Sequence, residues 1–424
     1  MAGDGTLSSN INVIIAKLTV CVVVCAAGFV VLQRVQNHVR ESHLLRSGVI
    51  GMTTLKFLAC ILLYVIAPGR VVYSDAALYY LPETQRLLQG YLPYRDFPTS
   101  YSPLFHALLA PGVWCWNSVG SIVLTMLLFE AMTLFLYIKT AETSSHLLRW
   151  RVAFIYTTSP ISYYWIGMTG YNGAIIQFFT MLSLFFIMKG KDAFTGIFAA
   201  IGLLCSKLLA GVVWPALVLV RRPGWAARVM GLAVAPVVLL GFYFAGFDVL
   251  LPLKREFGAV TSGNLWFLAS TVIPALSTEG AIHWISWIRI VSVLLMIGAV
   301  LMPSFRRVSL SPSALLDRAI AAVALSYLVI LIVGPKSYPF YLAMTFLFLV
   351  HVMSTTDVVR LRRLWPLAGL GVLSILEDYL WMMVRGTDYG LKQPLVLLLV
   401  ATDLAVIACY LWIAMQCVRI LRSK

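Results

Sequence analysis

Long apolar runs recur along the whole chain of 424 residues, and they restrict its fold more than any other feature. A helix needs about 20 apolar residues to cross the hydrocarbon core of a bilayer, and runs near this length follow one another from end to end. Apolar residues make up 61% of the chain, against roughly 45–50% in soluble domains. No stretch between the runs is long enough for a separate soluble core. We therefore expect one all-α polytopic membrane domain over residues 1–424.

The candidate spans predict a bundle of about 11–13 transmembrane helices. Residues 193–220 are long for one crossing and short for two, and basic residues flank them on both sides. We therefore expect a short hairpin there, with Lys207 at its tip. The N-terminal run lacks the features of a signal peptide, so we expect it to be retained. The predicted spans are 11–32, 49–68, 119–138, 152–168, 172–188, 193–206, 208–220, 229–246, 284–302, 319–334, 338–353, 365–384 and 394–416.

The net charge of +15 is explained by membrane topology, and no nucleic-acid partner is expected. With the loop after the first span placed in the cytoplasm, 20 of the 32 lysines and arginines fall in cytoplasmic segments, ten in the opposite segments and two within spans. This bias predicts an outer N-terminus and a cytoplasmic C-terminus. The two longest outer segments are then 69–118 and 247–283, and we expect the chemistry of the protein to face the outside of the cell membrane.

The first outer segment concentrates polar residues in the stretch "SDAALYYLPETQRLLQGYLPYRDFPTSYSPLFH" at 74–106. Asp75 follows the second span directly, so its carboxylate is expected at the membrane boundary, where partial loss of water makes a carboxylate a better base. An ordinary interfacial acid is the alternative interpretation. Residues 81–90 predict a short amphipathic helix lying on the membrane. Residues 91–103 form a rigid, proline-rich aromatic segment suited to gripping a polyhydroxylated ligand.

These motifs resemble the first luminal loop of the GT-C superfamily of membrane glycosyltransferases. The order of a span, "SDAALYY", a helix ending in "QG", "YLPYRDF" and "YSPLFH" is similar to its polyprenyl-phosphate-mannose-dependent, family 87-like branch. Ser102 stands where that branch commonly has proline. Weaker similarities follow in "GYNGAIIQ" at 170–177, "LLCSKLLAGVVWP" at 203–215 and "GPKSYPFYL" at 334–342.

The resemblance implies an inverting glycosyltransferase with a GT-C-like bundle, which transfers a sugar, mannose by default, from a polyprenyl-phosphate donor to a lipid or glycan acceptor. Asp75 would be the general base. No cofactor or divalent metal is expected, although an ion shared by Asp75 and Asp96 is an alternative. The implied substrate-binding residues are Tyr79, Tyr94, Arg95, Asp96, Tyr101 and Asn172, and the donor phosphate would meet Lys207, Lys336 and Tyr341.

Other interpretations of these residues stay open. Each lysine can instead snorkel to the interface. His106 can assist a phosphate or acceptor, or be structural. The acids within spans are expected to point into the bundle towards a partner; they are Glu130, Glu377, Asp378 and Asp403. If these acids couple ions, the chain is a transporter or flippase of lipid-linked sugars; a non-enzymatic assembly subunit is the third class.

Overall fold

A computed structural model describes the chain over residues 19–28, 30–31, 39–66, 74–220, 223–252, 261–273, 276, 297–298, 310–334, 337–356, 365–384 and 393–422. Within these ranges the chain is helical and forms no strand, apart from an isolated β-bridge between Pro93 and Phe97. The all-α class predicted from the sequence is confirmed. Lys336, residues 11–18, 29 and 32 of the first predicted span, and all of the predicted span 284–302 except 297–298 lie outside the described residues.

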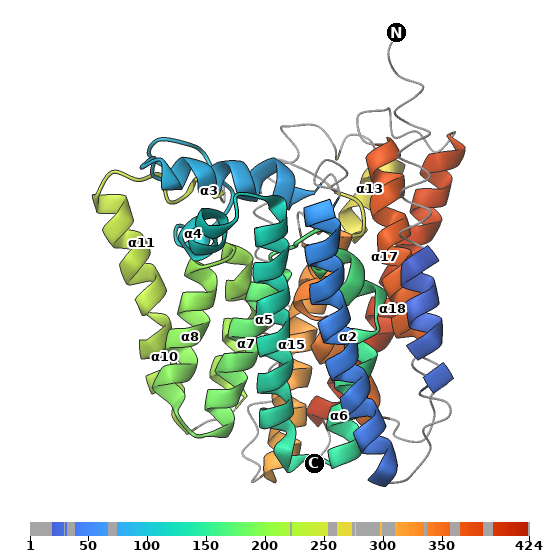
Figure 1. Ribbon diagram of the computed structural model, residues 1–424. Helices are drawn as coiled ribbons and strands as arrows, with labels where there is room; N and C mark the ends of the chain where they lie inside the picture. The colour runs from blue at the N-terminus through green and yellow to red at the C-terminus, as the bar shows by residue number, and fades with distance from the viewer. Residues whose placement is uncertain are drawn as a thin grey trace.

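The long helices pack side by side with their axes roughly along one direction, and short helices lie across one end of the bundle (Figure 1). The α-helices are α2 (Val39–Ile66), α3 (Leu81–Leu88), α4 (Phe105–Cys115), α5 (Val119–Thr140), α6 (His146–Thr157), α7 (Gly173–Met188), α8 (Asp192–Leu204), α9 (Trp214–Leu219), α10 (Trp225–Leu232), α11 (Val234–Phe244), α13 (Leu265–Val272), α15 (Pro312–Val333), α16 (Phe346–Thr356), α17 (Trp365–Val384) and α18 (Pro394–Arg422). The shorter turns are η1 (Ala76–Tyr80), η2 (Ala141–Thr143), η3 (Ser162–Ile166), η4 (Leu208–Val213) and η7 (Pro339–Met344).

Helix α15 lies in the middle of the bundle (Figure 1) and is buried along nearly its whole length. Its first turn is set by local sequence, because the Ser311 hydroxyl accepts from the Ala314 amide at 3.3 Å and Pro312 occupies the first helical position. Small residues in "AIAAVALS" let neighbouring helices approach closely. Helices α7, α9, α16 and α18 pack around it.

Six helices of the described part are long and apolar enough to cross a membrane, and several shorter apolar helices accompany them. The chain is therefore a polytopic membrane protein; the predicted number of 11–13 crossings stays a prediction. The predicted span 365–384 coincides with α17, and 172–188 with α7 to within a residue. Two other predicted spans are interrupted: 152–168 divides into α6 and η3, and 338–353 into η7 and α16.

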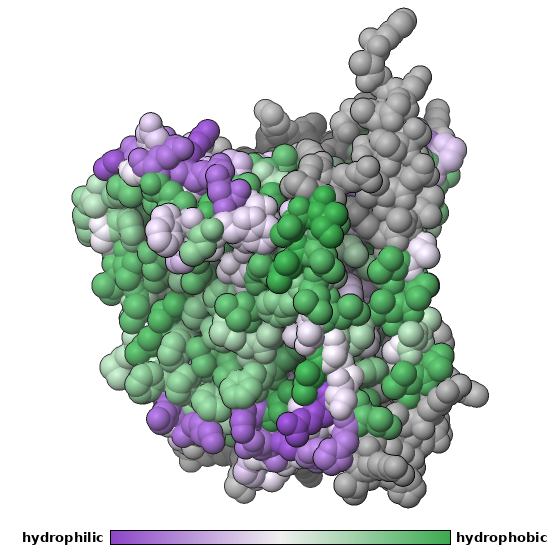
Figure 2. All heavy atoms as spheres, in the orientation of Figure 1, coloured by the Kyte–Doolittle hydropathy of each residue, from purple (hydrophilic) through white to green (hydrophobic). Residues whose placement is uncertain are grey.

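Polar residues gather at the two ends of the bundle and leave an apolar band between them (Figure 2). One end carries α3 and α4, whereas the C-terminal end of α18 lies at the other (Figure 1). Helix α5 runs away from the α3 end, so Lys139 in its last turn belongs to the opposite end, as the charge count predicted. The side of the membrane that each end faces stays a prediction.

The hairpin predicted within 193–220 is present as α8, a turn at 205–207, and the following pair η4 and α9. Lys207 precedes η4 directly and so lies at the turn. The predicted helix at 81–90 is also present as α3. It buries the polar Glu83 and Thr84 against α4, packs Leu81 on the apolar core and leaves Leu88 45% exposed.

Candidate functional site

A cavity of about 310 Å³ opens at the α3 end of the bundle. Six chain segments converge on it: residues 74–83 through η1 into α3, the loop at 100–101, residues 164–171 around the end of η3, the turn at Lys207, residues 338–340 at the start of η7, and residues 378–382 of α17. The lining residues are Ser74, Asp75, Leu78, Tyr79, Glu83, Ser100, Tyr101, Tyr164, Trp165, Thr169, Tyr171, Lys207, Tyr338, Phe340, Asp378, Trp381 and Met382.

Asp75 stands at the N-terminus of the π-helical turn η1 and presents its carboxylate to the cavity. The Tyr101 hydroxyl donates a hydrogen bond to Asp75 Oδ2 at 3.3 Å. Burial first, and the Asp75 carboxylate second, raise the pKa of Tyr101 well above its usual value. The phenol therefore stays protonated at physiological pH and can donate its hydrogen bond to Asp75.

Tyr101 is itself held by its neighbours in the aromatic segment. The Tyr94 hydroxyl donates to the Tyr101 carbonyl, and the Tyr101 amide donates to Thr99 Oγ1 at 3.2 Å. Tyr94 has a positive φ of 66°, a conformation that costs a non-glycine residue energy and persists only where the surroundings determine it. The ring of Tyr101 stacks on Phe105, with centroids 4.7 Å apart. Tyr94 thus supports the cavity from behind.

Lys207 brings a positive charge to the same cavity. Its ammonium group lies over two aromatic rings, 5.1 Å from the centroid of Tyr101 and 5.3 Å from that of Tyr341. It also donates a hydrogen bond to the Tyr341 hydroxyl at 3.4 Å. The side chain is nearly buried, so the cation is directed into the site and does not snorkel to the surface. Tyr101 therefore contacts both the carboxylate of Asp75 and the ammonium group of Lys207.

Aromatic side chains form the opposite wall. Phe340 stacks on Tyr338 with centroids 4.6 Å apart, and it meets Tyr171 at 4.6 Å and Trp165 at 5.6 Å. The Tyr164 hydroxyl completes this side with a hydrogen bond to the hydroxyl of Tyr379 on α17 at 3.2 Å. Such a wall offers flat apolar faces next to polar groups, which suits a sugar ring.

Glu83 lines the cavity from α3, and His106 holds it there. His106 is fully buried; its Nδ1 lies 3.2 Å from Thr84 Oγ1, and its Nε2 lies 3.2 Å from Thr99 Oγ1 and 2.9 Å from Glu83 Oε2. Both ring nitrogens are thus engaged by the protein. This favours the structural interpretation of His106, which joins α3 to α4.

The structure brings together only some of the residues predicted from sequence. Asp75, Tyr79, Tyr101 and Lys207 line the cavity, and Tyr341 reaches it through Lys207. Tyr94 lies behind Tyr101 and does not line the cavity, and neither do Arg95, Asp96 or Asn172.

Arg95 and Asp96 form an ion pair with each other, with Arg95 Nη2 2.8 Å from Asp96 Oδ2. The Leu92 amide donates to the same carboxylate at 2.8 Å. These hydrogen bonds, that of Arg95 above all, lower the pKa of Asp96 below its ordinary value. Asn172 is fully buried at the start of α7. Asp96 is thus engaged with Arg95 and does not line the cavity that Asp75 lines.

Sequence reasoning missed most of the aromatic wall. Tyr164, Trp165, Tyr338 and Phe340 were not singled out, although each pair lies within five residues of a proline that interrupts a predicted span, Pro160 or Pro339. An aromatic cluster beside a proline inside a membrane span is therefore the signal that would have found them.

The acids within the spans divide into three cases. Glu130 is paired with Lys56 of α2, with Lys56 Nζ 3.0 Å from Glu130 Oε2, which confirms a partner inside the bundle. Asp378 borders the cavity, whereas Glu377 does not. Glu377 and Asp403 are both fully buried and meet beside Gly263, whose amide donates to Asp403 Oδ2 at 3.1 Å.

Within the described residues, no group of three or more histidine, cysteine, aspartate or glutamate side chains is arranged to hold a metal ion. No protein-family model, curated protein or solved structure matches the chain. The fold and the site therefore define its class as an all-α polytopic membrane protein with an acid- and lysine-containing aromatic cavity near one end of the bundle.

Proposed function

We propose that the protein is a membrane glycosyltransferase that transfers a sugar, mannose by default, from a polyprenyl-phosphate donor to a hydroxyl of a lipid or glycan acceptor at the extracytoplasmic face. The observation that carries the proposal is the connection made by Tyr101. Its hydroxyl bonds the Asp75 carboxylate and its ring lies under the Lys207 ammonium group, so a proton acceptor and a cation share one cavity.

The reaction is a single inverting displacement. Asp75 removes the proton from the acceptor hydroxyl as the acceptor oxygen forms a bond to the anomeric carbon. The bond between that carbon and the phosphate oxygen breaks, and the polyprenyl phosphate leaves with the bonding electrons. The proton ends on Asp75, whose carboxylate the hydroxyl of Tyr101 orients through its hydrogen bond.

The leaving phosphate gains negative charge, and Lys207 supplies the positive charge that stabilises it. Because the ammonium group is held between Tyr101 and Tyr341, it is oriented before the donor arrives. The wall at Trp165 and Phe340 gives the sugar a stacking surface. The lipid tail of the donor remains in the apolar band that surrounds the bundle (Figure 2).

The decisive experiment incubates the purified protein with a panel of polyprenyl-phosphate sugars and native lipid acceptors, and identifies the product by mass spectrometry. Asp75→Asn is expected to lower transfer by at least about a hundredfold, since general-base catalysis contributes roughly 10²–10⁴. Asp248→Asn is the matched control, because Asp248 does not line the cavity. Transfer at the wild-type rate by the Asp75 variant would exclude Asp75 as the base.

A transporter of lipid-linked sugars is the second candidate function. The buried pair of Glu377 and Asp403 favours it, because two carboxyl groups close together in a membrane bundle are a recurrent means of coupling protons or cations. This candidate predicts proton- or sodium-dependent uptake into proteoliposomes that Asp403→Asn abolishes and Asp75→Asn leaves intact. If instead Asp75→Asn abolishes sugar transfer and Asp403→Asn leaves sugar transfer intact, the enzyme is supported.

A further inference from the structure

Two irregular segments supply the aromatic wall of the cavity. The π-helical turn η3 carries Tyr164 and Trp165, and the 3₁₀ turn η7 carries Phe340, with Tyr338 directly before its first residue. Neither turn is as regular as an α-helix, because the hydrogen-bond geometry of a 3₁₀ turn is poorer and a π-helical turn is a short local departure from the α-helix. Their side chains nevertheless meet ring to ring, so contacts outside the two turns must fix them.

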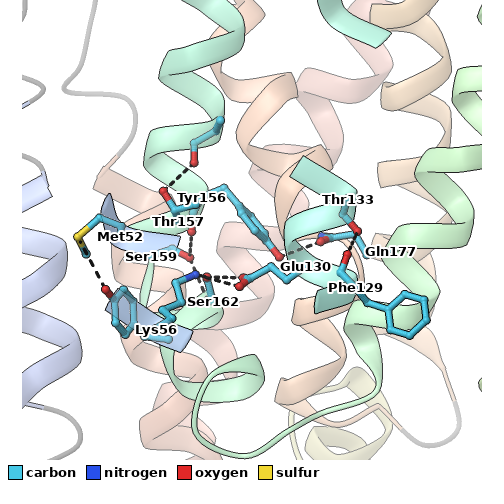
Figure 3. Close-up of polar contacts among 12 residues, drawn as sticks. Met52, Lys56, Phe129, Glu130, Thr133, Tyr156, Thr157, Ser159, Ser162 and Gln177 are labelled. Atoms are coloured by element: carbon cyan, nitrogen blue, oxygen red, sulfur yellow. Dashed lines mark hydrogen bonds and ion pairs between the residues drawn. The ribbon is translucent and has the colours of Figure 1, made fainter. Parts of the chain in front are cut away.

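The first of these contacts is a triangle of buried polar groups behind η3 (Figure 3). Lys56 of α2 donates to Glu130 Oε2 of α5 at 3.0 Å. The hydroxyl of Ser162, the first residue of η3, accepts from Lys56 and donates to Glu130 Oε1. The two charged side chains are each 1% exposed, so protein groups have to supply their further hydrogen bonds, and Ser162 supplies one to each of them.

A second arm of the same network reaches η7. The Tyr156 hydroxyl of α6 donates to Gln177 Oε1 of α7 at 2.8 Å, and Gln177 Nε2 donates to the carbonyl of Ala343 in η7 at 3.3 Å. Ser159 joins the arms, because its hydroxyl donates to the Tyr156 carbonyl at 2.7 Å and accepts from the Ser162 amide at 3.2 Å. Figure 3 shows Tyr156, Gln177 and Ser162 around Glu130.

We propose that this buried network positions the two halves of the aromatic wall against each other, and that Ser162 and Tyr156 are its positioning residues. Ser162 anchors η3 to the charge pair, and Tyr156 anchors η7 through Gln177. The network lies outside the cavity lining and acts on the ligand only through Trp165 and Phe340. The identity of the ligand as a sugar ring rests on the proposed function, whereas the anchoring of η3 and η7 by the network does not.

Hydrogen–deuterium exchange of the purified protein tests the anchoring without any substrate. Ser162→Ala is expected to raise amide exchange in peptides covering η3 by about tenfold, and Tyr156→Phe to do the same in peptides covering η7. Thr133→Val is the matched control, because the buried Thr133 hydroxyl bonds only the Phe129 carbonyl of its own helix, at 2.7 Å. Unchanged exchange in both turns, or an equal rise in the control, overturns the inference.

Transfer kinetics test the link to the site. If the wall binds the sugar equally in the ground and transition states, Ser162→Ala and Tyr156→Phe raise the donor KM by about tenfold and change kcat much less. Ser162→Thr, which keeps the hydroxyl, restores KM. A fall in kcat at unchanged KM means loss of active protein and overturns the positioning role. If the wild-type protein transfers no sugar, the proposed function is refuted. The hydrogen–deuterium exchange of η3 and η7 then tests the anchoring by the network on its own.

Discussion

Breaking the charge pair of Lys56 and Glu130 is expected to destabilise the protein far more than removing the whole pair. The two charges are 3.0 Å apart and nearly inaccessible, so their attraction is about 5 kcal/mol at an effective dielectric constant near 20. Each charge also loses several kcal/mol of hydration on burial, which offsets most of that attraction. Glu130→Leu or Lys56→Met alone therefore leaves an uncompensated charge and costs about 3–5 kcal/mol.

The double variant Lys56→Met with Glu130→Leu removes both charges and is expected to cost only about 1–2 kcal/mol, which reflects the lost hydrogen bonds of Ser162. Unfolding in mixed micelles by titration with sodium dodecyl sulfate gives the free energies. The control pair is Lys139 and Glu142, 3.2 Å apart but about half exposed, where Glu142→Leu should cost less than about 1 kcal/mol. The reasoning is refuted if the double variant costs as much as the two single variants added together.

Three further predictions concern the site. Lys207→Met should lower kcat/KM by at least about tenfold, with a fall in kcat, because the lost charge stabilises the leaving phosphate in the transition state. Tyr341→Phe removes one hydrogen bond and should lower kcat/KM by only a few-fold; steady-state kinetics compare the two variants. Asp96→Asn should leave the pH profile of transfer between pH 5 and 8 unchanged, because Arg95 holds the Asp96 pKa below its ordinary value and the carboxylate does not titrate there; a shifted acid limb contradicts this. His106→Ala should lower the midpoint of thermal unfolding by several degrees, because it leaves Glu83 and two threonines without a buried partner. An unchanged midpoint with lost activity would instead give His106 a chemical role.

The local features of the fold were predictable from sequence. Hydropathy located α17 and α7 closely because an apolar run of membrane length has few alternatives to a helix. The turn at Lys207 followed from run length and flanking charge. The interruptions at η3 and η7 were missed, because a proline or an aromatic cluster changes the mean hydropathy of a run very little.

The site was predictable where its residues lie next to a span end. Asp75 and Tyr101 belong to one polar segment, and Lys207 stands out as a charge within an apolar run, so all three were identified before their contacts were known. Arg95 and Asp96 were equally conspicuous, but they satisfy each other outside the cavity. Residue type and position along the chain did not distinguish the residues that line the cavity from Arg95 and Asp96, because the charged residues of both sets stand out from the apolar chain in the same way.

The sequence by itself determined that this chain is an all-α membrane protein, since backbone groups in lipid must be satisfied within helices, and it placed an acid and a lysine at breaks in the apolar pattern. Only the tertiary structure decided that Tyr101 joins them, that Trp165 and Phe340 form one wall, and that Lys56 lies against Glu130, 74 residues away, and Ser162, 106 residues away. Periodicity records which face of a helix is apolar. It does not record which other helix that face meets, because the meeting depends on how all the helices pack together.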